Sequence, residues 1–248
     1  MENTPADTLC VRKESGFLDR NALKYIVIVT MVLDHVAWGF ESSLPLMVTN
    51  LFHFVGRLTG PTMAYFLYEG YVHTRDVAKY QKRLGIFAII SWLPFTFFES
   101  GIDKLIDRPF FLLQQSVIFT LFLGITALRI WDSSKLKKSD KIVLIVVLCI
   151  LSLIGDWPVM DVLGPLFLSI YRTDKKKKYI ALTLVYLPNL LLVFVDGWYN
   201  LGVLLVPIMI VYCYNGKGGS KSAFNKWFFY VFYPLHLIIL GILKWYVF

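Results

Sequence analysis

The sequence predicts an all-α protein, a single bundle of about nine transmembrane helices. Three observations predict this fold. Of the 248 residues, 57% are hydrophobic and 17% are charged, and the mean hydropathy is +0.61; soluble domains have about 45–50% apolar and about 25% charged residues. The apolar residues form long runs with short polar segments between them. The basic residues gather in alternate polar segments, as they do in membrane proteins with many spans.

Dividing the chain at charges, glycines and prolines gives nine candidate spans, with eight to ten as the range. These spans are 22–40, 46–71, 84–98, 109–130, 142–155, 157–171, 179–196, 199–214 and 227–247. Several are shorter than the roughly 20 residues that cross about 30 Å of hydrocarbon. The sequence therefore predicts the order of the spans better than their ends. The pattern shows no internal repeat and no linker, which predicts one membrane domain over 22–248.

The basic residues predict the orientation of the bundle. Of the 25 Lys and Arg residues, 21 fall on one side of the nine-span arrangement, within 12–24, 75–83, 129–141, 172–178 and 217–226. The positive-inside rule makes that side cytoplasmic, with the N-terminus inside and residues 1–21 as a cytoplasmic tail. We expect a multi-pass protein of the plasma or inner membrane. The net charge of +8 then belongs to the lipid surface, and no nucleic-acid partner is expected.

The first span carries ionisable residues that a purely structural span would avoid. Lys24 stands at its beginning, and Asp34 and His35 stand well inside it. A charge in hydrocarbon costs several kcal/mol, so such residues usually have a function. Lys24 and His35 are eleven residues apart, which places them on one face of a helix at a separation of about 16 Å. This arrangement suits an elongated anionic ligand that enters from the cytoplasm and presents its reactive end at depth.

The second span is the richest in polar chemistry. His53, Arg57 and Glu69 lie within membrane depth, and His73 shares a face with Glu69. Two interpretations of Arg57 are open: it pairs with a carboxylate to hold two helices together, or it acts in a functional site. His53 is equally compatible with a structural role and with a substrate contact. The glycines and proline within 56–61 predict a bend beside protein or a wet cavity.

Later polar residues have simpler explanations. Gln114 and Gln115 are expected to form hydrogen bonds between helices. The turn at Asp156 and Trp157 is expected to anchor the chain at the interface, although it could also form the rim of a substrate entrance. In the last span, Tyr233 and His236 flank Pro234, which predicts contact with the interior cavity. The basic run 175–178 is either a topology signal or a phosphate site.

Five segments together resemble the TraX family, whose best-known activity is acetylation of the N-terminal amine of conjugative pilin. They are LKYIVIVTMVLDHV (23–36), GRLTGPTMAYFLYEGYVHTR (56–75), LLQQSVIFTLFLG (112–124), the acidic turn at Asp156, and FFYVFYPLHLIIL (228–240). The chain is also similar to the wider acyltransferase-three class, which has a basic residue, ten spacers and a histidine in its first span. Lys24 and His35 match that pattern.

The resemblance implies an acyltransferase that takes acetyl-CoA from the cytoplasm and acylates an amine or hydroxyl of a peptide, glycan or small molecule. We predict His35 as the general base, Asp34 or Glu69 as the carboxylate that fixes its tautomer, and Arg57 as the group that stabilises the oxyanion. The predicted donor-binding residues are Lys24, His73, Arg75, Tyr233 and His236. We expect no metal.

Two other classes of function remain open. Intramembrane Asp, Glu, His and Arg residues also build the proton relays of transporters and flippases. Such proteins often have inverted repeats and helices interrupted at matching places, which this sequence does not show. A non-catalytic scaffold would explain the bundle, but it would leave no reason for Lys24 and His35 to share a face.

Overall fold

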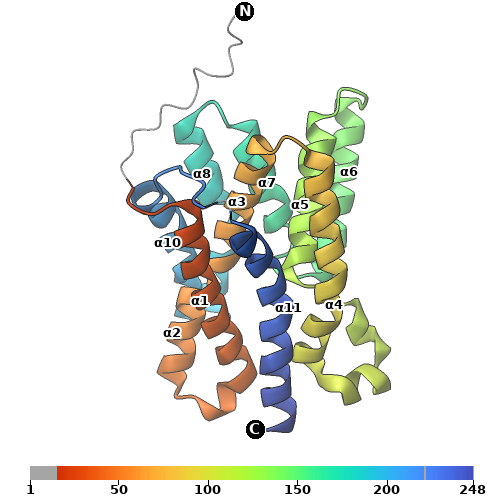
Figure 1. The fold of residues 1–248 in the computed structure, drawn as a ribbon, viewed down its shortest axis with the longest axis vertical. Helices are drawn as coiled ribbons and strands as arrows, with labels where there is room; N and C mark the ends of the chain where they lie inside the picture. Colours follow the sequence, from red (N-terminus) through yellow and green to blue (C-terminus); the bar gives the residue numbers. More distant parts are fainter. Residues whose placement is uncertain (1–15, 221, 248) are drawn as a thin grey trace, which may run out of the picture.

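The computed structural model of the chain describes residues 16–220 and 222–247. Within these residues, helices are the only regular secondary structure apart from two isolated β-bridges, which confirms the predicted all-α fold. Of the predicted cytoplasmic tail, residues 1–15 lie outside the described part of the chain. Figure 1 shows the helices running side by side along the long axis, with α1 beginning in the upper half of the view and the C-terminus at the lower end.

The elements follow one another with short connections. In order they are α1 (Arg20–Phe40), η2 (Glu41–Ser43), α2 (Leu46–Gly56), α3 (Thr59–His73), α4 (Val77–Asp107), η3 (Pro109–Leu113), α5 (Val117–Asp132), α6 (Lys138–Leu151), η4 (Ser152–Ile154), α7 (Met160–Ile170), α8 (Lys175–Val185), α9 (Pro188–Leu191), η5 (Leu192–Phe194), η6 (Trp198–Leu204), α10 (Leu205–Ile208), η7 (Met209–Cys213) and α11 (Ala223–Tyr246). The expected bend in the second span is the break between α2 and α3 at Arg57 and Leu58.

Three helical segments of the described chain are long and apolar enough to cross a membrane: Arg20–Ser43, Val77–Asp107 and Trp227–Tyr246. A fourth candidate is the pair Lys176–Val185 and Pro188–Phe194, which is bent by 41°. Such segments are typical of a membrane protein. The count of nine spans and the orientation of the N-terminus stay predictions.

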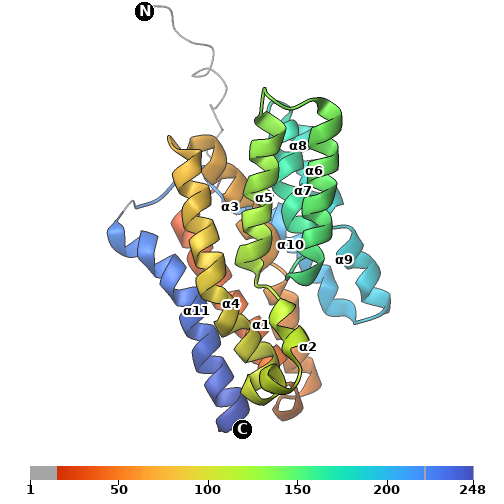
Figure 2. The same cartoon turned by 90° about the vertical axis from the view of Figure 1, so that its right-hand side faces the viewer.

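The remaining helices are short because several of them end inside the molecule. α5, α6 and α7 have 16, 14 and 11 residues, about 24, 21 and 17 Å at 1.5 Å per residue, against about 30 Å of hydrocarbon. Figure 2 shows α5 beginning near the middle of the molecule, where α6 ends and α7 begins. A β-bridge between Gln115 and Gly155 ties these helix ends together. Irregular backbone therefore lies at mid-depth, as beside a cavity.

The outer surface is rich in apolar side chains. On α6, Val143 and Ile150 are 61% and 60% exposed, and on α4 Ile89 is 72% exposed. A water-soluble protein scatters such residues singly and keeps large contiguous apolar areas covered. An apolar surface along the long axis is the one that lipid would cover.

Four helices of the described chain, α1, α4, α8 and α11, begin with a side-chain cap. The carboxylate of Asp76 accepts a hydrogen bond from the Lys79 amide at 2.9 Å, and that of Asp174 accepts one from the Lys177 amide at 3.0 Å. These backbone donors hold the pKa of each capping carboxyl below its usual value, because they favour the ionised form. Charged caps of this kind, outside the candidate spans, belong at a water-facing surface.

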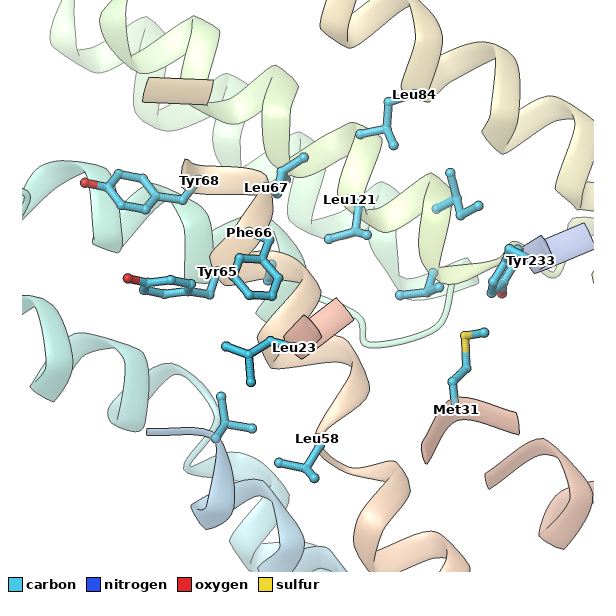
Figure 3. Close-up of a cluster of buried hydrophobic side chains, with 14 of the residues drawn as sticks. Leu23, Met31, Leu58, Tyr65, Phe66, Leu67, Tyr68, Leu84, Leu121 and Tyr233 are labelled. Carbon is cyan, nitrogen blue, oxygen red and sulfur yellow. The ribbon is translucent and has the colours of Figure 1, made fainter. Parts of the chain in front are cut away.

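The main core is built around α3, which is buried on all of its faces from Thr59 to Tyr68. Side chains of α1, α4, α5, α7, η6 to η7 and α11 belong to the same buried cluster, including Leu23, Leu84 and Leu121 (Figure 3), and α7 makes the most extensive contact with α3. An amphipathic surface helix would have a single buried stripe. α3 is thus the central helix, and the break at its beginning lies inside the bundle.

Candidate functional site

The break between α2 and α3 places Arg57 beside Asp34 of α1. Arg57 Nη2 lies 3.5 Å from Asp34 Oδ1, and Nδ1 of His53 donates to the same oxygen at 2.7 Å. Gly56 allows this approach, because a Cβ at that position would overlap the Asp34 side chain. Asp34 therefore accepts from His53 and Arg57 rather than from His35. The pairing of Arg57 with a carboxylate, one of its two interpretations, is therefore present. The histidine in this cluster is His53, which the sequence left open between a structural role and a substrate contact.

The orientation of the His35 ring is fixed by its own helix. Its Nδ1 lies 2.8 Å from the carbonyl oxygen of Met31. A carbonyl oxygen can only accept, so Nδ1 carries the proton and Nε2 holds the lone pair. No side-chain carboxylate bonds to the ring among the described residues, so the predicted role of Asp34 or Glu69 in fixing the tautomer is filled by the backbone.

His236 of α11 repeats this arrangement beside His35. Its Nδ1 lies 3.1 Å from the carbonyl oxygen of Phe232, and the centroids of the two imidazoles are 5.0 Å apart in an edge-to-face contact. The His236 side chain is buried, and its Nε2 has no hydrogen-bond partner among the described residues. The sequence predicted His236 near the interior, and the structure places it directly against the predicted base.

His35 lines a cavity of about 450 Å³, which we call the His35 cavity. Its polar lining comes from α1, the α2–α3 break, α4, the segment before α5 and the turn before α7. The lining residues are Asp34, His35, Trp38, Arg57, Phe95, Glu99, Phe110, Leu113, Gln114, Gln115, Leu153, Ile154, Gly155, Asp156 and Trp157. The cavity thus joins one imidazole, one guanidinium and three carboxyl groups with an aromatic and aliphatic wall.

Aromatic rings hold the guanidinium of Arg57 in this cavity. Its Cζ lies 5.5 Å from the ring centroid of Trp157 and 5.6 Å from that of Tyr199. Cation–π contact and the Asp34 carboxylate together stabilise a charge that would be costly in an apolar interior. Arg57 Nε has no hydrogen-bond partner among the described residues. The side chain is therefore fixed in place while part of its donor capacity stays unused.

A second cavity, of about 370 Å³, lies at the other end of α1, among the starts of α1, α4 and α11. We call it the Arg83 cavity. Its lining includes three cationic side chains, Arg20, Lys24 and Arg83, with the aromatic rings of Phe229 and Tyr230. Further lining residues are Asn21, Met63, Phe66, Leu67, Gly70, Thr74, Tyr80, Leu84, Ile118, Leu121, Gly218, Ser220, Ser222 and Asn225. Cations, amides and aromatic faces together suit a ligand that carries both phosphate and a flat ring.

Lys24 and His35 both face the interior, as their spacing predicted, but they line different cavities. Lys24 lines the Arg83 cavity, where its Nζ lies 5.1 Å from the Phe229 ring centroid. No residue lines both cavities. The path along α1 between the two predicted residues is therefore interrupted by packed side chains.

Three other predicted site residues lie away from both cavities. Glu69 accepts a hydrogen bond from the Tyr214 hydroxyl and lines neither cavity. His73 and Arg75 are exposed and also line neither. The structure places these three residues apart from His35 and Arg57. Tyr233, in contrast, is buried beside His236, with ring centroids 5.4 Å apart.

Several cavity residues were not predicted as site residues. Glu99 lines the His35 cavity from α4, and Arg20 and Arg83 line the other cavity. Gln114 was expected to form hydrogen bonds between helices, and its Oε1 accepts one from the Ser100 hydroxyl of α4 at 3.5 Å. It also lines the His35 cavity, as does Asp156, whose turn was expected to anchor the chain or to form the rim of an entrance. Glu99 follows a long apolar run within 84–98, and its charge at the edge of that span was the signal that could have identified it.

No group of three or more His, Cys, Asp or Glu side chains among the described residues is placed to hold a metal ion. The chemistry that these residues can support is acid–base and electrostatic: an imidazole with a lone pair on Nε2, a fixed guanidinium, and carboxyl groups along one wall.

The chain matches known proteins along most of its length. It is 36% identical over 230 residues to the Dichelobacter nodosus protein named "Probable fimbrial assembly protein FimC, serogroup H1", a match that covers 88% of this chain and 92% of the relative. No solved structure matches the chain. Residues 19–244 match the family described as TraX protein. This match runs from the N-cap of α1 almost to the end of α11, and the chain therefore belongs to the TraX family, as its sequence motifs indicated.

Proposed function

We propose that this protein is a multi-pass acetyltransferase of the inner membrane, with about nine spans and a cytoplasmic N-terminus. It transfers the acetyl group of acetyl-CoA to an amine or hydroxyl of an acceptor. The observation that carries the proposal is His35. Its protonated Nδ1 is occupied by the Met31 carbonyl, which leaves the basic Nε2, and the ring lines a cavity that also contains Arg57. An imidazole held in this tautomer is ready to accept a proton.

The Arg83 cavity is the proposed entry site of the donor. It lies at the end of the molecule that carries most of the basic residues, and Arg20, Lys24 and Arg83 line it. Guanidinium and ammonium groups bind phosphate through charge-assisted hydrogen bonds. The aromatic rings can stack on the adenine. With the nucleotide end held there, the pantetheine arm runs along α1 toward His35, about 16 Å further along the helix, and the side chains packed between the two cavities have to move aside for it.

The reaction then follows from the side chains of the His35 cavity. The acceptor nitrogen or oxygen attacks the thioester carbon, and His35 Nε2 takes the acceptor proton. The carbonyl oxygen becomes an oxyanion, and the positive charge of Arg57 stabilises it in a site with little water. The C–S bond breaks, and the CoA thiolate takes the proton from the imidazolium. In total, one C–N or C–O bond replaces one C–S bond and one proton moves from the acceptor to the CoA thiolate, so the step needs no redox partner.

A peptide acceptor is favoured among the acceptor classes. The relative from Dichelobacter nodosus is named as a fimbrial assembly protein, and this chain shares 36% of its residues over 230 positions. A fimbrial subunit or another exported polypeptide is therefore the proposed acceptor. Trp38, Trp157 and the carboxyl groups of Glu99 and Asp156 in the His35 cavity offer contacts to its reacting end.

The test uses the purified full chain in detergent. CoA and acetyl-CoA should raise its thermal unfolding temperature, because a ligand that binds the folded state stabilises it. Radiolabelled acetyl-CoA should transfer its label to a peptide or polymer extracted from producing cells. His35→Ala should abolish label transfer while CoA still stabilises the variant, since the Arg83 cavity is intact. Transfer by His35→Ala at a near-normal rate would remove His35 from the mechanism, and no thermal shift at millimolar CoA would overturn the proposal.

A transporter or flippase is the second candidate. Two cavities at different depths with packed side chains between them also suit alternating access across a membrane. The label distinguishes the two functions, because a transporter moves its substrate unchanged. Covalent transfer of the acetyl group favours the enzyme, and movement of an anion across vesicle membranes without transfer favours the transporter.

A further inference from the structure

Buried side chains of four helices lie between the two cavities. Along its axis, each helix has a residue that lines the Arg83 cavity, then a buried residue, and then a residue that lines the His35 cavity or, on α11, contacts His35. On α1 this buried residue is Met31, on α4 it is Ser91, at the start of α5 it is Ser116, and on α11 it is Tyr233. Figure 3 shows the Met31 side chain pointing from α1 toward Tyr233. We call these four residues the partition.

The partition and its neighbour His236 contain buried polar atoms that make no hydrogen bond to a described residue. The hydroxyls of Ser91, Ser116 and Tyr233 and the Nε2 of the adjacent His236 have no hydrogen-bond partner among the described residues. Ser91 and Ser116 are 0% exposed, and Tyr233 and His236 are 5% exposed. These are four of the nine such buried atoms in the described chain, and Tyr233 lies beside both His236 and Ser116. A buried polar atom without a hydrogen bond destabilises the folded state, so this group of four atoms indicates a site for a ligand.

Two of these hydroxyls converge at the positive end of a helix. Tyr233 Oη lies next to Ser116 and the Val117 amide, and α5 begins at Val117 with Ser116 as its N-cap residue. The Ser116 side chain makes no capping hydrogen bond. The first amides of a helix carry partial positive charge, which adds to the two O–H groups. Donors arranged in this way favour an oxygen on which negative charge develops.

We propose that Ser116 and Tyr233 form the oxyanion hole of the acyl transfer, with the carbonyl oxygen of the acetyl thioester between their hydroxyls. This inference rests on the proposed acetyltransferase function and assigns the direct donors. Arg57 is already engaged by Asp34 and by two aromatic rings, so it supplies charge from the side of the His35 cavity. In the transition state the attacked carbonyl oxygen takes the electron pair of its π bond and accepts both O–H donors.

The position of the partition fits this role. His236 connects the two parts of the site, because its ring lies 5.4 Å from Tyr233 and 5.0 Å from His35, centroid to centroid. A thioester held at Tyr233 is therefore separated from the His35 imidazole by no more than the side chain of His236. Met31 has to move for the acyl group to reach this position. Its unbranched side chain adapts to such a change at low cost.

The test removes single hydroxyls. Tyr233→Phe and Ser116→Ala should each lower kcat for acetyl transfer by a factor on the order of 10²–10³, with the KM for acetyl-CoA unchanged. Among the described residues, the Tyr233 hydroxyl lies near only the Ser116 hydroxyl and the Val117 amide, so both variants should unfold close to the wild-type temperature. Tyr186→Phe and Ser169→Ala are matched controls, since both residues are buried and line neither cavity. Both should keep the wild-type kcat.

A spectroscopic measurement makes the test independent of the acceptor. Acetyl-CoA labelled with carbon-13 at the carbonyl should show a lower C=O stretching frequency when bound to the wild-type protein, and Tyr233→Phe should reverse that shift. A kcat within about twofold of wild type in both variants, or a loss of acetyl-CoA affinity with unchanged kcat, would overturn the oxyanion hole. If the wild-type chain neither binds acetyl-CoA nor transfers its acetyl group, the acetyltransferase proposal itself fails, and with it this inference.

Discussion

Replacing Asp34 tests whether the cluster at the α2–α3 break is structural. Asp34→Ala leaves the Arg57 guanidinium and the His53 ring without their shared acceptor. The Asp34 and Arg57 side chains are only 17% and 14% exposed, so solvent screens the lost charge poorly. Removing one partner of a buried ion pair costs about 3–5 kcal/mol. The hydrogen bond from His53, at 2.7 Å to an ionised group, is of the strong class and worth about 1.5–3 kcal/mol of that total.

The assay is reversible unfolding in mixed micelles, with circular dichroism as the readout. Asp34→Asn should lose less stability than Asp34→Ala, because the amide oxygen can still accept from His53. The double variant Asp34→Ala with Arg57→Ala should be less destabilised than the sum of the two single variants, since it leaves no unpaired charge. His35→Ala, one residue further along α1, should change the free energy of unfolding much less. An Asp34→Ala protein within about 0.5 kcal/mol of wild type would refute a structural role for this pair.

Two further predictions follow from the cavities and from close packing. Arg83→Ala should raise the Kd of CoA at least about tenfold, because a charge-assisted contact to phosphate is worth about 1.5 kcal/mol or more. The control variant Arg75→Ala, at an exposed position, should leave that Kd within about twofold of wild type. Calorimetric titration measures both Kd values, and equal effects of the two variants would contradict the proposed donor site. Gly202→Ala should destabilise the fold by about 1–3 kcal/mol, since its Cβ would overlap the Phe54 carbonyl oxygen where η6 packs on α2. A thermal unfolding temperature equal to wild type would show that this contact is not close.

The local pattern of the chain was enough to predict several features of the site. Lys24 and His35 are eleven positions apart, which places both on one helical stripe, and both face the interior. The glycines and proline near Arg57 predicted an interruption, and α2 ends at Gly56. These predictions hold because helical periodicity and helix-breaking residues act within a few turns, and burial of charge in an apolar span is costly wherever the span lies.

Contacts between helices could not be read from the same pattern. Nothing in the order of residues indicates that Asp34 meets His53 rather than His35, or that Glu99 of α4 joins His35 in one cavity. Glu69 has the same spacing signal as a catalytic carboxylate, yet its rotation on α3 directs it to Tyr214. Such pairings depend on the rotation and depth of each helix, which are set by the packing of the whole bundle.

The sequence by itself determined that this protein is helical and apolar, with an interior face on its first helix that carries a lysine and a histidine, because composition and helical period are properties of each segment alone. Only the tertiary structure decided that two cavities divide that face and that α5 begins at mid-depth beside Tyr233. The physical reason is that a cavity exists where several helices fail to fill space together. The partition between the cavities is therefore a property of four packed helices, and no one of them shows it alone.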